Sequence, residues 1–103
     1  LPEPDVMLQR AMAVTGCEDE YLVARMVQVV CDITAYCRRN GITDGSSGMR
    51  GLIDWITSTE ISGDPYRSAL CTVISRAAPD EEDREALISA VLEPIFAPGR
   101  RKR

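Results

Sequence analysis

Four short breaks divide this chain into five segments, and they limit its fold more than any other feature. The breaks are rich in glycine, proline or small polar residues, and they lie at residues 16, 40–46, 62–65 and 79–80. The last two place an aspartate that can cap a helix beside a proline, which favours a new helix at that point. Within each segment, apolar residues recur every three or four positions, as on the buried face of a helix. The sequence therefore predicts an all-α fold, a compact bundle of about five helices.

The expected helices cover residues 4–15, 18–39, 47–60, 65–77 and 81–95. In the first helix, Leu8, Ala11 and Met12 form the expected inner face. The second helix is the longest, and Val23 and Val27 widen an apolar stripe made of Leu22, Met26, Val29, Val30, Ile33 and Cys37. Such a broad stripe predicts a central helix that packs on two sides. The short connections favour antiparallel neighbours.

The length and the charge of the chain limit its class. Its 103 residues allow one domain, which we assign to residues 1–97, followed by a basic flexible tail at 98–103. The net charge is −4 despite that tail, so the body is acidic and unsuited to nucleic acid. No run of about 18 apolar residues is present, so we expect no membrane span. The chain begins at Leu1 without a methionine, and we expect a fragment of a longer protein.

Histidine and several motifs that many catalytic sites use are missing from the sequence. Without histidine there is no Ser-His or Cys-His pair and no imidazole ligand. The four cysteines include no C-x-x-C pair, which argues against a metal site and for reduced, buried thiols in a cytoplasmic protein. No G-x-x-x-x-G-K-[ST] phosphate loop is present, and we identify no catalytic residue. The acidic run at 80–83 is interpreted as a helix start, where negative charge is favourable.

One helix start combines a capping residue with a cation. Ser47 is a suitable N-cap, and Met49 begins the apolar stripe of the helix that follows. Arg50 falls in the first turn, where free backbone amides attract anions and the guanidinium adds its own charge. Alone, the pattern is only a weak indication of phosphate contact by Arg50 and favours an ordinary solvated arginine at a helix start that Ser47 and Met49 shape. Trp55 is interpreted as a packing residue of the same helix.

The segment from Ser47 to Trp55 contains a serine, a short gap, an arginine and then Leu-Ile-x-Trp. This pattern resembles the second-sensor helix in the C-terminal lid of MoxR-type AAA+ ATPases. The order of helices over residues 4–97 is also similar to that lid. The resemblance implies that Arg50 reaches the γ-phosphate of ATP, bound with Mg²⁺ by a core domain of the same protein. It further implies a chaperone-like parent ATPase whose subunits form a hexameric ring, with an unspecified client. The fragment alone would bind no cofactor.

Alternatives stay open at this stage. Gly48 and Gly51 flank Met49 and Arg50 and weaken the helix start, which indicates either a mobile arginine or a site that no longer senses nucleotide. The alternative function is a stand-alone helical protein-interaction module. A DNA-binding helix-turn-helix is disfavoured, because the chain is acidic and Asp54 would face phosphates.

Overall fold

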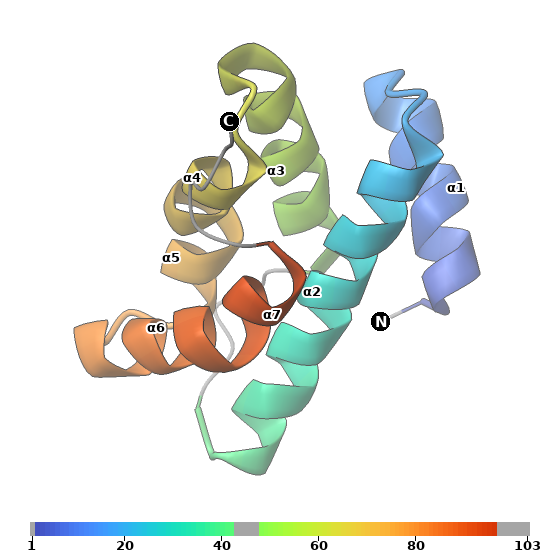
Figure 1. Cartoon of the computed structure of the whole chain (residues 1–103). Coiled ribbons are helices and arrows are strands. Elements are labelled where there is room, and N and C mark those ends of the chain that lie inside the picture. Colours follow the sequence, from blue (N-terminus) through green and yellow to red (C-terminus); the bar gives the residue numbers. More distant parts are fainter. Residues whose placement is uncertain (1, 43–47, 97–103) are drawn as a thin grey trace.

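Each of the four breaks separates two helices in the computed structural model, which describes residues 2–42 and 48–96. The α-helices are α1 (Pro4–Thr15), α2 (Glu20–Arg39), α3 (Gly48–Ser62), α4 (Pro65–Ala69), α5 (Ser75–Ala77), α6 (Glu81–Leu87) and α7 (Glu93–Ile95). Two π-helical segments, η1 (Leu70–Ile74) and η2 (Ile88–Leu92), join α4 to α5 and α6 to α7. The described residues thus form five continuous helical stretches and no strand (Figure 1). The predicted all-α bundle is confirmed.

Helix α2 is the centre of the bundle. It contacts α1, α3 and η2, so neighbours cover it on more than one side (Figure 1). Val23 and Val27, which widen its apolar stripe, are both buried. This arrangement confirms the expectation of a central helix with two packed sides. The wide apolar stripe makes it possible, because a narrower stripe could face only one neighbour.

The helix ends follow local capping chemistry. Gly16 ends α1 with a φ of 77°, a left-handed conformation that glycine adopts without strain, and its N–H donates to the carbonyl of Met12. Asp64 caps α4 by accepting from the backbone N–H of Arg67 at 3.2 Å. Asp80 caps α6 in the same manner. These ends were predictable because each cap lies within a few residues of the group it satisfies.

Of two expectations about the first helices, the start of the second helix needs correction, and the inner face of the first, whose Leu8, Ala11 and Met12 do pack on the core, was incomplete. Helix α2 begins at Glu20 and not at residue 18, because the carboxylate of Asp19 accepts from the N–H of Leu22 at 3.1 Å and makes Asp19 the N-cap. On α1, Met7 is fully buried together with Ala11, whereas Leu8 and Met12 are only half-buried. Since α1 contacts both α2 and α3, the centre of its buried face lies at Met7 and Ala11.

The π-helical segments were not predicted from the sequence. In a π-helix each carbonyl bonds to the amide five residues on, so the turn is wider than in an α-helix. In η1, three consecutive residues (Thr72, Val73 and Ile74) are buried. Cys71 lies on the exposed side of the same segment, so the expectation of four buried thiols is wrong for this cysteine.

Aromatic side chains join the C-terminal end to the core. The rings of Trp55 and Phe96 meet edge to face, with centroids 5.5 Å apart and an interplanar angle of 66°. Trp55 is fully buried, which confirms its interpretation as a packing residue. None of the described helices has the length and apolarity that a membrane crossing needs.

Candidate functional site: the start of α3

Arg50 lies in the first turn of α3 and is exposed. The same helix buries Leu52, Trp55 and Ile56 almost completely, which fixes its orientation on the core. Met49 is half-buried and packs against that core. Ser47, the predicted N-cap, lies outside the described residues. The packing of α3 therefore directs Arg50 outward from a rigid support.

The surroundings of Arg50 favour an anion. The first turn of α3 contains no acidic residue, and the positive end of a helix adds to the charge of the guanidinium. Within the described ranges 2–42 and 48–96, no ion pair of Arg50 occurs. Arg50, Ile53 and Asp54 line a shallow hollow of about 380 Å³. A guanidinium offers several donors to phosphate oxygens, whereas the carboxylate of Asp54 in the same hollow opposes an anion.

The carboxylate of Asp54 is engaged by a second arginine. Arg76, from α5, places its Nη1 2.6 Å from Oδ2 of Asp54, and both side chains are about 40 % exposed. This pair connects α3 to the fourth helical stretch. Sequence analysis missed Arg76, and no local pattern could have found it, because the two residues lie on different helices and meet only in the folded chain.

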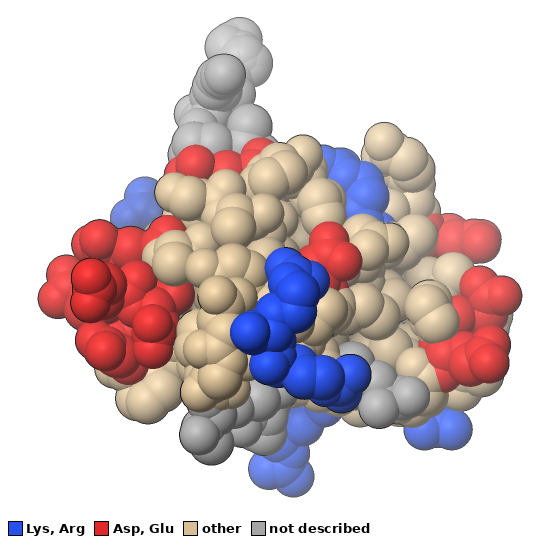
Figure 2. Space-filling model, turned by 90° about the horizontal axis from the view of Figure 1, so that it is seen from below, with Lys and Arg blue, Asp and Glu red and all other residues tan. Residues whose placement is uncertain are grey.

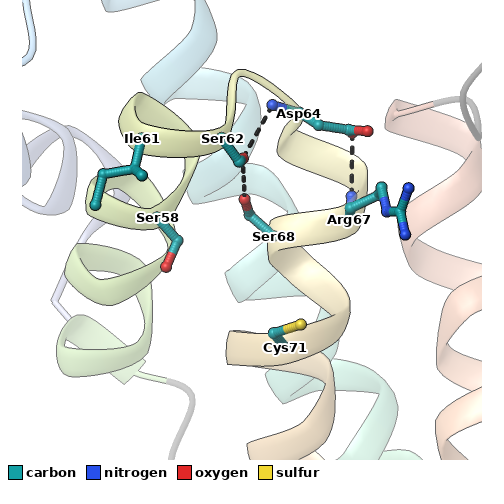
Figure 3. Close-up of a pocket in the computed structure, with 7 residues that line it drawn as sticks. All are labelled: Ser58, Ile61, Ser62, Asp64, Arg67, Ser68 and Cys71. Carbon is teal, nitrogen blue, oxygen red and sulfur yellow. Dashed lines mark hydrogen bonds between the residues drawn. The ribbon is translucent and has the colours of Figure 1, made fainter.

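A larger groove lies at the junction of α3 and α4, with a volume of about 540 Å³ (Figure 3). Its polar groups largely bond to one another. Ser62 Oγ lies 2.9 Å from the hydroxyl of Ser68 and accepts from the N–H of Asp64. Ile61, which is 84 % exposed, lies on its rim. The groove therefore offers an apolar edge for contact and no set of catalytic side chains. It is lined by Ser58, Ile61, Ser62, Asp64, Arg67, Ser68 and Cys71.

Acidic side chains gather at the α6 end of the molecule, on the left of the face in Figure 2. Asp80 caps α6, and residues 81–83 fill its first turn. Negative charge at this position interacts favourably with the helix dipole and stabilises the helix, as expected from the sequence. No group of three potential metal ligands is formed by the part of the chain that the structure describes.

Two titratable groups have shifted pKa values. Burial raises the pKa of Tyr66, and the hydrogen bond that its hydroxyl donates to Glu93 at 3.2 Å adds to this rise. Burial also raises the pKa of the Cys31 thiol, as does the nearby charge of Asp32. A thiol with a raised pKa is a poor nucleophile at neutral pH, so Cys31 is not a candidate catalytic residue.

Comparison with known proteins identifies no relative. The chain has no significant match among protein-family models, curated proteins or solved structures.

Proposed function

We propose that this chain is the lid of a MoxR-type AAA+ ATPase and that Arg50 is its second-sensor arginine. The observation that supports the proposal most is the placement of Arg50, which is exposed in the first turn of a helix whose opposite face is anchored in the core. The packed helix fixes the backbone at Arg50, and the side chain has no ion pair among the described residues, so it can reach toward a phosphate across an interdomain cleft.

In this proposal the nucleotide is bound elsewhere. ATP and Mg²⁺ lie on the core domain of the same protein, and the lid contributes one cation to the γ-phosphate. Arg50 contacts ATP and loses that contact with ADP, which has no γ-phosphate. Because this contact exists in only one nucleotide state, it shifts the equilibrium between lid positions. Hydrolysis therefore moves the lid relative to the core and to neighbouring subunits of the ring.

Chemical protection of arginine tests the proposal without a mutation. The complete open reading frame that encodes this chain is expressed, and the protein is treated with an arginine-selective dicarbonyl reagent in the presence of Mg²⁺ and either ADP or a non-hydrolysable ATP analogue. We expect modification of Arg50 to slow with the ATP analogue but not with ADP. Arg67, exposed on α4, is the internal control and should react equally in both states. Equal modification of Arg50 in both states contradicts the proposal.

A second function is favoured by the groove between α3 and α4. Ile61 is 84 % exposed where it lines this groove, so it offers a partner apolar surface that could be buried on binding. The chain would then be a stand-alone helical protein-interaction module. An open reading frame without a phosphate loop, encoding a protein in which Ile61→Lys abolishes binding of an isolated partner, would favour this function over the lid.

A further inference from the structure

One carboxylate lies within reach of two arginines at the start of α3. Arg50 and Asp54 are four residues apart on one helix and line the same hollow, so they lie on the same face. Opposite charges at this spacing attract each other. The carboxylate of Asp54 is nevertheless engaged by Arg76 at 2.6 Å, and Arg50 forms no ion pair within the described residues.

Arg76 reaches Asp54 from a firmly packed segment. The nearby residues Ile74, Ala77 and Ala78 have at most 1 % of their surface exposed, so the backbone that carries Arg76 is fixed on the core. Arg50 also lies beside buried residues, Gly51 and Leu52, so the backbone is fixed at both arginines. Arg50 would pair with Asp54 along one helix with the cation on the N-terminal side, which is the less favourable order at this spacing, whereas Arg76 reaches the carboxylate from another helix.

We propose that Arg76 is a positioning residue that occupies Asp54 and thereby keeps Arg50 available to an anionic ligand. If Arg76 is removed, Asp54 pairs with Arg50 along the helix and draws the guanidinium away from the incoming anion. The competition between the two arginines needs no ligand and no other domain. Its effect on the binding of a nucleotide's phosphates rests on the proposed lid function.

The competition can be tested without any ligand. The mobility of the Arg50 side chain is measured from the heteronuclear NOE of its Nε–Hε group by ¹⁵N NMR. We expect a mobile guanidinium in the wild-type chain, a more ordered one in Arg76→Gln, and a mobile one again in Arg76→Gln/Asp54→Asn. Arg67→Gln removes the same charge from exposed α4 and should leave Arg50 mobile. Arg50 that stays as mobile in Arg76→Gln as in the wild type overturns the proposal. Circular dichroism confirms that each variant is folded.

The consequence for binding is tested with inorganic tripolyphosphate as the probe. We expect Arg76→Gln to weaken binding at Arg50 by about twofold relative to Arg67→Gln, which is the size of effect that one exposed ion pair allows. The double variant should regain that loss. Equal affinities in Arg76→Gln and Arg67→Gln overturn the positioning role and leave the lid proposal intact. Tripolyphosphate that leaves the Arg50 signal unchanged in every variant counts against the lid proposal, while the ligand-free result still decides the competition.

Discussion

The indole Nε1–H of Trp55 donates a hydrogen bond of 2.8 Å to the backbone carbonyl of Pro65, the first residue of α4. Trp55 has no exposed surface, so its indole N–H would be buried without a partner if this bond were lost, and such a group is costly. The same side chain packs against Phe96 near the C-terminal end. Trp55 therefore connects α3, which carries Arg50, to both of the later helical stretches.

Replacing Trp55 with Phe should lower the free energy of unfolding by about 2 kcal/mol. The substitution removes the donor to Pro65 and leaves a gap where the larger ring was. Urea denaturation measures the change. Tyr21→Phe is the control, because Tyr21 is 74 % exposed and its change should stay below about 0.5 kcal/mol. A loss below that limit for Trp55→Phe would show that the indole hydrogen bond does not stabilise the fold.

Arg25, on α2, binds the last described residues through a hydrogen bond and a cation–π contact. Its guanidinium donates to the carbonyl of Ile95 at 2.7 Å and lies 4.3 Å from the ring centroid of Phe96. We expect Arg25→Met to lower the free energy of unfolding by about 1–2 kcal/mol, because it removes a charge-assisted hydrogen bond and a cation–π contact.

Hydrogen exchange locates the effect of the Arg25 substitution. Amides of residues 93–96 should exchange faster in Arg25→Met than in the wild type. Arg10→Met, on the exposed side of α1, is the matched control and should leave those rates unchanged. Unchanged exchange at 93–96 in Arg25→Met would mean that packing of Phe96 alone fixes this end.

The raised pKa of Tyr66 predicts a loss of stability at alkaline pH. Its ordinary pKa is 10.0, and burial, followed by the hydrogen bond to Glu93, moves the folded-state pKa above that value. The unfolded chain therefore releases this proton at a lower pH than the folded chain. The contribution is complete below pH 10 and decreases as the pH rises through the raised pKa.

Urea denaturation between neutral and strongly alkaline pH isolates this contribution when the wild type is compared with Tyr66→Phe. The free energy of unfolding should fall more steeply for the wild type above pH 10, because the variant lacks the titrating hydroxyl. Tyr21 and Tyr36 are present in both proteins and cancel in the difference. Parallel curves for the two proteins would contradict the assigned effect of Tyr66.

The main features of the fold were predictable because their signals are local. Gly16, Asp64 and Asp80 each act on a backbone group within four residues, and such pairs can be found in the sequence. The start of α2 was placed two residues too early because a run of acidic residues offers several possible caps, and only the geometry selects Asp19.

The remaining features depend on contacts between distant parts of the chain. Met7 is central to the buried face of α1 because two helices cover it, and one segment cannot reveal how its neighbours are arranged. The pair of Asp54 and Arg76 joins two helices, and neither residue is unusual in its own segment. The sequence therefore identified Arg50 as a candidate but not the second arginine that leaves it unpaired among the described residues.

ATP turnover of the protein encoded by the complete open reading frame tests the central claim most directly. Arg50→Ala is compared with Arg67→Ala, which removes the same charge from an exposed position on α4. We predict that Arg50→Ala lowers kcat/KM for ATP by about tenfold or more, the effect of losing one charge-assisted contact to a phosphate, and that Arg67→Ala leaves it unchanged. Equal turnover in the wild type and Arg50→Ala would contradict the assignment of Arg50 as a nucleotide sensor.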